Sequence, residues 1–487
     1  MRTLLAGSLA FVISGCAAEP FEVNEGFFGG VGADAPLAAL AARDVLVSGG
    51  TAVDAVVSAY FVSAVTLPSS FGLSAGGSCV VFDPAEKKFE RLSFHPSPSS
   101  DGGAAIALPL APRAMFALHA RYGRTRIAQL TTEAEKLARF GFRVSRQVSE
   151  DIQTYGDRLD WGDRGTNPFG DRSRAKLRQG ETATRLELAV TLGRMRAAGI
   201  GDLYEGRLAR SFVDGATAAG YRVDADRLRR ILPVWSTVEG TEYDNHVWAV
   251  AGTHSGEEAT AKAMLKAAFF SRSRLSGADS EDAHLLAEAG RKSSAATTNV
   301  GVLGDGRGPS VGAGGIFAVD RRGQAASCSF TLGAPFGVGR VAGETGITMA
   351  PVDVAPERSA TAFGLLVGNR NVWQVHLAMT ASGGRGSSSA LAEVVMKHYL
   401  DGKPMDEAIA APRAHFAAKA GLMLIEPGMG EKARSGIARL GYRTAEVAKI
   451  GAVRMMRCFG GLPKGEGVCG IGNDRRASGL VIFEGEN

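Results

Sequence analysis

Helical spacing of apolar residues marks the start of the folded part of the chain. From Pro36 the apolar positions recur every three or four residues, and Gly49-Gly50 ends this first expected helix. A second helix is expected from Thr51 through Val65, where almost every position is apolar. Because a helix without a polar face has no side to turn toward water, this segment is expected to be buried.

The middle of the chain is also expected to be mainly helical. Helices are predicted within 112–158 and 183–232, with Gly206 and Gly220 as breaks in the second group. Residues 256–296 begin as a helix and continue as a polar stretch rich in Ser and Ala. That composition is typical of exposed linkers, so the polar stretch is expected to be one.

Strand patterns occur in two places. Apolar runs at 78–82 and 89–94 predict a hairpin. The last third is richer in strands and contains a further hairpin turn at Asp320–Gly323. Helices followed by a strand-rich block indicate stacked α/β layers. Further strands are expected at 248–251, 316–319, 325–332, 362–367, 373–380 and 422–425, and helices at 387–400 and 405–411.

The N-terminus differs from the rest of the chain. Arg2 precedes the apolar run Leu4–Ile13, which is too short to span a bilayer and is typical of a secretory signal. Ile13-Ser14-Gly15-Cys16 is similar to a bacterial lipobox, in which the cysteine becomes the lipidated first residue. The alternative is an ordinary signal peptide in which this cysteine has no special role.

The lipobox predicts where the protein is found. Residues 1–15 are expected to be a signal peptide, and residues 16–35 a lipidated tether. The protein is then expected on the periplasmic side of a bacterial envelope, held to the membrane by its lipid. Ala17, rather than Asp, after the cysteine favours the outer membrane.

Composition excludes several classes of protein. With 45% hydrophobic and 22% charged residues among 487, the chain is neither disordered nor collagen-like, and no other segment is apolar for long enough to span a membrane. The net charge of +5 is not gathered in a basic run, so no nucleic-acid partner is expected. The histidines and cysteines lack metal-site spacing, and neither a metal nor a cofactor is expected.

Four cysteines follow Cys16. An exported protein can form disulfides, and Cys458 and Cys469 are close enough in sequence for a local bridge. The alternative is that Cys79, Cys328, Cys458 and Cys469 are all buried thiols. The sequence leaves both possibilities open.

Two glycine-rich motifs have little catalytic content. Gly72-x-Ser74-x-Gly76 matches the nucleophile elbow of hydrolases, but that elbow follows a strand and precedes a helix, whereas here the order is reversed. Gly304-Asp305-Gly306-Arg307-Gly308 lacks the Gly-Lys-Ser/Thr ending of a phosphate-binding loop, and no helix follows it. Both motifs are expected to be ordinary loops.

A third glycine-rich turn has more chemical content. The segment Ala381-Ser382-Gly383-Gly384-Arg385-Gly386 follows a predicted buried strand and precedes a predicted helix. A Gly-Gly pair at such a junction leaves backbone N–H groups at a helix N-terminus, where they can stabilise an oxyanion or a carboxylate. The alternative is a tight strand-to-helix turn without a ligand.

Taken together, the segments resemble the γ-glutamyltranspeptidase family of N-terminal-nucleophile hydrolases. The resemblance is collinear over roughly residues 36–480, and the order and spacing of the segments carry it. The segments are GGTAVDAVVSA, PSSFGLSAGGSCVVFD, LSFHPSP, ALHARYGRTRIAQLTTEAEKLARFGFRVSR, LYEGRLA, FAVDRRGQAASCSFTL, FGVGRVAGETGITMAP, ASGG, AIAAPRAHF and GNDRRASGLV.

The resemblance implies an α/β fold of the four-layer αββα sandwich type. It also implies a large-subunit-like region at 36–296, a linker or processing region at 297–312 and a small-subunit-like region at 313–487. In the family the precursor cuts itself and frees a Thr, whose hydroxyl attacks a γ-glutamyl amide with its own amino group as base. The implied substrates are small γ-glutamyl compounds such as glutathione, and the acyl group passes to water or an amino acid.

Some site residues carry over directly from the family. Its oxyanion hole is a Gly-Gly pair, which corresponds here to Gly383 and Gly384, and the neighbouring Ser382 is expected to contact the substrate. The arginine that binds the substrate carboxylate is replaced by His95, which is shorter and fully charged only below about pH 6.5. Asp353 lies only loosely where the family has an acidic residue.

The chain departs from the family at the nucleophile. Counting back from Asp320, the position of the family's Thr-Thr-His holds Ala313-Gly314-Gly315, which offers no hydroxyl. Thr297 and Thr298 form the only nearby Thr-Thr pair, and their use would require an insertion and a rebuilt strand pairing. Ser310 is a weaker candidate.

Two hypotheses follow from these residues. The protein is either a γ-glutamyltransferase or hydrolase that uses Thr297 or Thr298, or a non-catalytic envelope lipoprotein of the same fold that binds amino-acid-like ligands. Loss of the nucleophile usually removes nearly all acyl-transfer activity. An active member is expected as two fragments, whereas a binding protein is expected to stay one chain.

Overall fold

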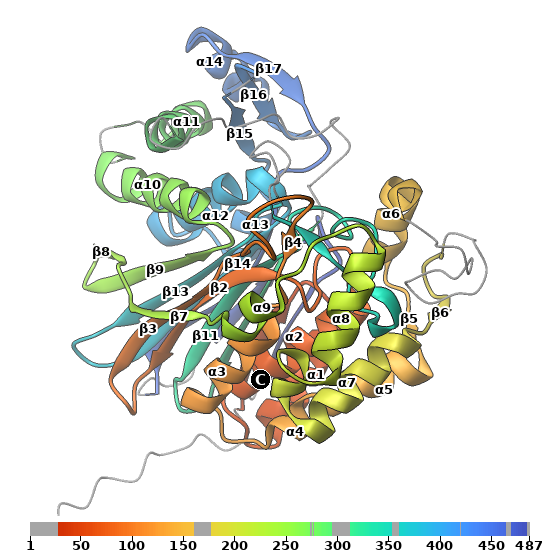
Figure 1. Ribbon diagram of the computed structural model, residues 1–487. Coiled ribbons are helices and arrows are strands. Elements are labelled where there is room, and N and C mark those ends of the chain that lie inside the picture. The colour runs from red at the N-terminus through yellow and green to blue at the C-terminus, as the bar shows by residue number, and fades with distance from the viewer. Residues whose placement is uncertain are drawn as a thin grey trace, which may run out of the picture.

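Two antiparallel sheets stack face to face at the centre of the computed structural model (Figure 1). The structure describes residues 28–159, 177–272, 275, 277–294, 312–352, 360–418, 420–463 and 469–484. In spatial order the first sheet contains β20 (Leu480–Glu484), β1 (Gly29–Ala33), β10 (Ala313–Asp320), β11 (Ala325–Thr331), β2 (Gly76–Asp83), β3 (Lys88–Phe94) and β7 (Val234–Thr237). The second contains β19 (Cys469–Asn473), β18 (Ala452–Leu462), β14 (Gln374–Ser382), β13 (Phe363–Asn369), β9 (His246–Gly252) and β8 (Thr241–Tyr243).

The inner faces of the two sheets share one apolar core. Phe317 of β10, Leu366 of β13 and Met456 of β18 belong to the same buried cluster. Glycine allows the closest approach, because a Cβ atom at Gly315 of β10 would lie only 2.6 Å from the Cβ atom of Thr380 on β14. The beginning of β10 and the end of β14 are therefore held against each other.

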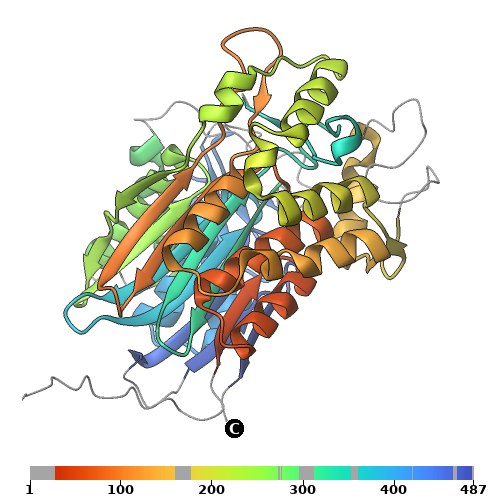
Figure 2. The ribbon, with the colours of Figure 1, turned by 60° about the horizontal axis from the view of Figure 1, so that its bottom comes forward.

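Helices cover both outer faces of the paired sheets (Figure 2). On the first sheet lie α1 (Pro36–Val47), α2 (Ala52–Thr66) and α3 (Ala111–Tyr122), with α5 (Thr132–Phe140) and α7 (Leu186–Ala198) in the same hydrophobic core. On the second sheet lie α10 (Ser255–Ser271) and α12 (Ser387–Val395). The predicted four-layer αββα sandwich is confirmed.

The helix α2 shows how directly the sequence specifies this packing. All its residues are buried, as its nearly uniform apolar sequence predicts. Its start is set by a capping box, in which Thr51 Oγ1 accepts a hydrogen bond from the Asp54 N–H at 3.1 Å and Asp54 Oδ2 accepts one from the Thr51 N–H at 3.0 Å. The apolar sequence of α2 therefore predicts its buried position correctly.

Both predicted hairpins are confirmed, and the cysteine question is answered. The turn after Asp320 closes with a 2.9 Å hydrogen bond from the Gly323 N–H to the Asp320 carbonyl. Cys79 on β2 and Cys328 on β11 are directly paired across the sheet and form a disulfide. Cys458 and Cys469 do the same on β18 and β19. The four cysteines are therefore two cross-strand bridges and not buried thiols.

Two sequence-based expectations are corrected. Part of the tether expected over 16–35 belongs to the fold, because Gly29–Ala33 is the buried strand β1. The expected linker contains a second helix, α11 (Asp279–Ser294), whose acidic first turn and basic last turn complement the helix dipole. Composition alone suggested a linker, but Leu286 and two alanines of this helix are buried against neighbouring elements.

The remaining elements lie around this sandwich. A smaller three-stranded sheet, β15 (Ala414–Ala417), β16 (Leu422–Ile425) and β17 (Arg443–Glu446), packs with α11 and α14 (Glu431–Arg439). Other helices are α4 (Ile127–Leu130), α6 (Arg146–Tyr155), α8 (Arg207–Ala218), α9 (Ala225–Arg230) and α13 (Met405–Ala410), and β4 (Ile106–Ala107), β5 (Phe142–Arg143), β6 (Thr182–Ala183) and β12 (Ala350–Pro351) are two-residue strands. Within the described ranges, no helix has the length and apolar character needed to cross a bilayer.

Candidate active site

Four strand ends meet at one end of the sandwich. The antiparallel pairing of β1 with β10 places the end of β1 beside the start of β10, and the pairing of β14 with β18 places Ser382 opposite Ala452. Because the two sheets are stacked, these ends surround a chamber of about 40 Å³. Its lining includes Asp34, Leu67, Ser70, Gln147, Ala313, Ser382, Gly383, Ala452, Ala477 and Ser478.

Ala313, the position that corresponds to the family nucleophile, is the first residue of β10 and lines this chamber. It is buried, and its side chain is a single methyl group. The preceding Gly312 donates a hydrogen bond from its N–H to Ser70 Oγ at 3.3 Å. The structure thus places position 313 where the resemblance implies a nucleophile, but the residue there has no atom that could attack a carbonyl.

The carboxylate of Asp34 is the main charged group of the chamber. Its Oδ1 accepts a hydrogen bond from Ser382 Oγ at 2.9 Å, and its Oδ2 accepts one from the Gly315 N–H at 2.6 Å. The guanidinium of Arg454, which has no exposed surface, forms an ion pair with the same carboxylate. Gly479 leaves room for this arginine, because a Cβ atom there would lie 1.8 Å from Arg454 Nε.

Gly383 and Gly384 form the turn between β14 and the helical segment that follows. Their φ angles are +103° and +77°, a region that favours glycine, so other residues would be strained in this turn. Gly383 lines the chamber. In the described part of the chain neither amide N–H has a hydrogen-bond acceptor. Two backbone donors are therefore available to an oxygen atom of a ligand.

A second carboxyl group, Asp151 on α6, lies behind the chamber wall. It accepts hydrogen bonds from Ser69 Oγ at 2.6 Å and from Gln147 Nε2 at 2.7 Å. Gln147 and the neighbour of Ser69, Ser70, both line the chamber. Burial among neutral partners raises the pKa of Asp151 to about 7. The Asp151 carboxyl group is thus linked by a hydrogen bond to Gln147, a side chain that lines the chamber.

His95 is not among the residues that line the chamber. It follows β3 and lies near Arg91 and the backbone of Gly252. Burial, and secondarily the charge of Arg91, lower the pKa of His95, so the ring is neutral at neutral pH. In this structure His95 provides no cation for a substrate carboxylate, in contrast to what its place in the family pattern suggested.

Several residues singled out in the sequence lie outside the described residues. They are Cys16, Thr297, Thr298, Ser310 and Asp353. Ser74 is fully buried in the loop before β2, as expected for a residue that is not a nucleophile elbow. Over the described ranges, no group of His, Cys, Asp or Glu side chains is arranged to hold a metal ion.

The sequence-based prediction did not identify Asp34 and Arg454 as residues of the candidate site. Asp34 lies directly after β1, in a segment expected to be a tether, and Arg454 lies on β18, a strand that was not predicted. Their pairing joins residues 420 positions apart, so no local pattern reveals it. The sequence did contain one indication, the acidic residue Asp34 two positions before Pro36, where the helical spacing of apolar residues begins.

Comparison with known proteins identifies the family and the fold. A family model described as Gamma-glutamyltranspeptidase matches residues 38–314 and 358–482. The crystal structure of cephalosporin acylase from Bacillus halodurans superimposes with a TM-score of 0.75 at 18% identity, covering 98% of this chain and 99% of that one. At this identity the superposition shows a shared fold.

Curated relatives match a smaller part of the chain. The glutathione hydrolase proenzyme of Bacillus subtilis (strain 168) is 26% identical over 254 residues, which cover 45% of this chain and 41% of that protein. Glutathione hydrolase 3 of Arabidopsis thaliana is 29% identical over 223 residues, covering 43% and 35%. The matched segments therefore span less than half the length of these relatives.

Replacing Asp34 with Asn is expected to destabilise the protein by about 3–5 kcal/mol, because it leaves the buried Arg454 charge without a counter-ion. The double variant Asp34→Asn/Arg454→Met should lose less than the sum of the single variants. Urea unfolding of the three variants measures this. The control Glu446→Gln, which breaks the exposed pair with Arg434, should cost less than about 1 kcal/mol. Additive losses at Asp34 and Arg454 would contradict the coupling.

Asp151 is expected to make the stability pH-dependent. Its pKa of about 7 in the folded protein lies above the ordinary value of 3.8, so the folded state holds the proton more tightly. Stability should therefore fall as the pH rises from about 4 to 7, by about 1.4 kcal/mol for each unit of pKa difference. Urea unfolding across this range should show a shallower decline for Asp151→Asn, and no such change for the exposed neighbour Glu150→Gln. Parallel curves for wild type and Asp151→Asn would refute this role.

Proposed function

This chain belongs to the γ-glutamyltranspeptidase family, and we propose that it binds γ-glutamyl compounds at the chamber without the self-cleaving acyl transfer of that family. The family acts on small-molecule γ-glutamyl substrates. The observation that carries the proposal is the alanine at the start of β10. Ala313 lines the chamber at the nucleophile position and offers only a methyl group.

Other groups in the chamber are also unsuited to replace the missing nucleophile. The hydroxyl of Ser382 donates its hydrogen bond to Asp34, whose carboxylate is already paired with Arg454. The same carboxylate also accepts a hydrogen bond from the Gly315 N–H, so its contacts are those of a structural ion-pair partner. Covalent catalysis needs a nucleophile together with a base that takes its proton. Ser382 and Asp34 do not form that combination, because the carboxylate is held by Arg454 and the Gly315 N–H.

The glycine turn that would bind a ligand carbonyl is present beside the chamber. The N–H group of Gly383, which lines the chamber, and that of the adjacent Gly384 are the candidate donors to a ligand carbonyl oxygen. The chamber of about 40 Å³ holds a few water molecules or one small planar group, such as an amide. We therefore expect the γ-amide of a ligand to enter the chamber while the rest of the ligand lies outside it.

Intact mass spectrometry of the purified chain from residue 17 tests the proposal. We expect a single uncut mass after long incubation and no hydrolysis of a γ-glutamyl anilide, because residue 313 cannot attack. Two fragments whose masses sum to the whole chain would overturn it. They would favour the second candidate, a γ-glutamyl hydrolase using Thr297 or Thr298, which the glutathione hydrolase relatives support.

A glycine variant tests the binding half. Gly383→Ala should abolish binding of γ-glutamyl compounds, measured by calorimetry, because the added methyl group strains the turn and enters the chamber. Gly402→Ala is the matched control, since Gly402 also has a positive φ, +69°, but no atom lies within 4 Å of an added Cβ. Unchanged binding by Gly383→Ala would remove this turn from the site.

We also propose that the protein is exported and anchored in the outer membrane by lipid on Cys16. The lipobox-like segment before Cys16 motivates this, and the two cross-strand disulfides support an oxidising compartment. Metabolic labelling with an alkyne fatty acid should label the wild type and not Cys16→Ala. Label that persists in the variant, or is missing from the wild type, would rule out this anchor.

A further inference from the structure

A larger cleft adjoins the chamber. It has a volume of about 780 Å³ and lies between α6, α13, β19 and the loop Asp474–Arg476. Arg146 lines the cleft and contacts Ser478 of the chamber, with 3.4 Å between Arg146 Nε and Ser478 Oγ. The next residue, Gln147, lines the chamber itself. The two spaces are therefore neighbours, with Arg146, Gln147 and Ser478 between them.

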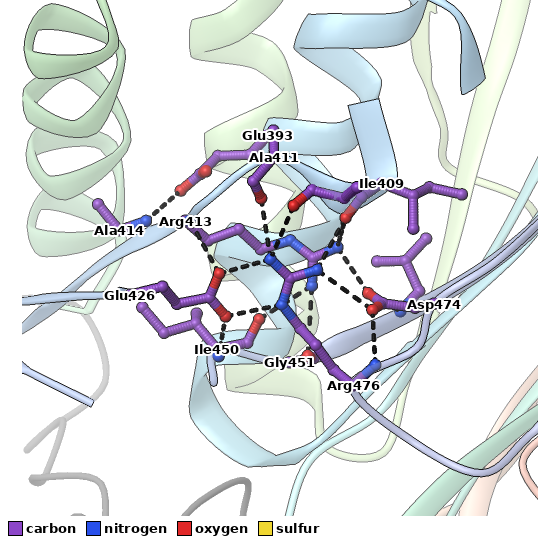
Figure 3. A network of polar contacts seen from close by, with 12 residues as sticks. Glu393, Ile409, Ala411, Arg413, Ala414, Glu426, Ile450, Gly451, Asp474 and Arg476 are labelled. Atoms are coloured by element: carbon purple, nitrogen blue, oxygen red, sulfur yellow. Dashed lines mark hydrogen bonds and ion pairs between the residues drawn. The ribbon is translucent and has the colours of Figure 1, made fainter. Parts of the chain in front are cut away.

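A buried ionic network holds two walls of the cleft in place (Figure 3). Arg413 donates to Asp474 Oδ2 at 2.6 Å and to the Ile409 carbonyl at 2.9 Å. Arg476 donates to the same Ile409 carbonyl at 2.8 Å and to Glu426 Oε1 at 2.8 Å. The end of α13 and the loop Asp474–Arg476 are thus tied together through shared partners. Side chains that project from these walls start from a fixed backbone.

Three charged side chains in the cleft have neither a hydrogen bond nor an ion pair with any described residue. Arg475 is exposed between the two fixed residues Asp474 and Arg476, and among the described residues it has no hydrogen bond or ion pair. The same is true, within those ranges, of the Asp406 and Glu407 side chains on α13. The other cations of the cleft are engaged, since Lys449 donates to the Arg476 carbonyl at 3.0 Å.

The last two charged side chains of the cleft, Arg146 and Glu150, form an ion pair with each other. Arg146 and Glu150 lie one helical turn apart on α6, with 3.8 Å between Arg146 Nε and Glu150 Oε1. Among the described residues of the cleft, the charged side chains without a hydrogen bond or ion pair are therefore one guanidinium and two carboxylates, and Lys449 adds a cation whose hydrogen-bond partner is a carbonyl. This set complements a zwitterion, whose carboxylate pairs with a guanidinium and whose ammonium group pairs with carboxylates.

We propose that this cleft binds the free α-amino acid head group of a γ-glutamyl ligand, with its α-carboxylate on Arg475 and its α-ammonium group on Asp406 and Glu407. The inference rests on the proposed function, since it places the γ-amide in the chamber. The chamber is too small for the head group, and His95 is neutral and outside it. The cleft takes over the contact that the family makes through the arginine replaced by His95.

Calorimetry with γ-glutamylethylamide tests the assignment, because this probe has one α-ammonium group, one α-carboxylate and one γ-amide. Its α-methyl ester and its N-acetyl derivative should each bind the wild type about 10-fold more weakly. Arg475→Gln should weaken binding of the parent probe about 10-fold and leave binding of the ester unchanged. Asp406→Asn/Glu407→Gln should weaken binding of the parent probe about 10-fold and leave binding of the N-acetyl derivative unchanged.

A matched control and the alternative outcomes keep the two proposals separate. Arg439→Gln alters an exposed arginine on α14, outside the cleft, and should change nothing. If the wild type does not bind the parent probe, the proposed function fails. If the parent binds but Arg475→Gln and the ester leave affinity unchanged, the cleft assignment fails and the proposed function stands.

Discussion

The buried ion pair between Asp34 and Arg454 determines how the two sheets meet at the candidate site. Asp34 follows β1 of the first sheet and Arg454 lies on β18 of the second. Taking both charges out of water is costly, and their attraction offsets that cost only when the remaining polar atoms are satisfied. The hydrogen bonds from Ser382 and Gly315 satisfy the carboxylate of Asp34 and bring β14 and β10 into the same arrangement.

This constraint explains how the chamber keeps its shape with an alanine at position 313. The strand ends are positioned by the ion pair, the close contact at Gly315 and the apolar core between the sheets, and none of these depends on the side chain at position 313. The Gly383-Gly384 turn is set by its own backbone conformation. The side chain of residue 313 is therefore not needed to hold the strand ends and the glycine turn in place.

The same physical principle operates beside the chamber. Arg413 and Asp474 are each 1% exposed and share partners with Arg476 and Glu426, so every charge in this group has an opposite charge or a backbone carbonyl beside it. Burial disfavours the charged form of Asp474, but the two arginines outweigh it and hold the pKa of that carboxyl below its ordinary value. The network is thus a rigid ionic support, and the exposed Arg475 next to it has no ion pair among the described residues.

The sequence alone determined the family, the layered fold, the buried helix α2, both hairpins and the glycine turn at 383–384. These depend on local patterns or on collinear motifs: apolar spacing in Ala52–Thr66, turn residues at Asp320–Gly323 and glycines at 383–384. Only the tertiary structure decided which cysteines pair, that Gly29–Ala33 is a central strand, and that Asp34, Arg454 and Asp151 belong to the site. Those features join residues far apart in the chain, and the energy of a buried charge or a cross-strand bridge depends on partners that no local pattern specifies.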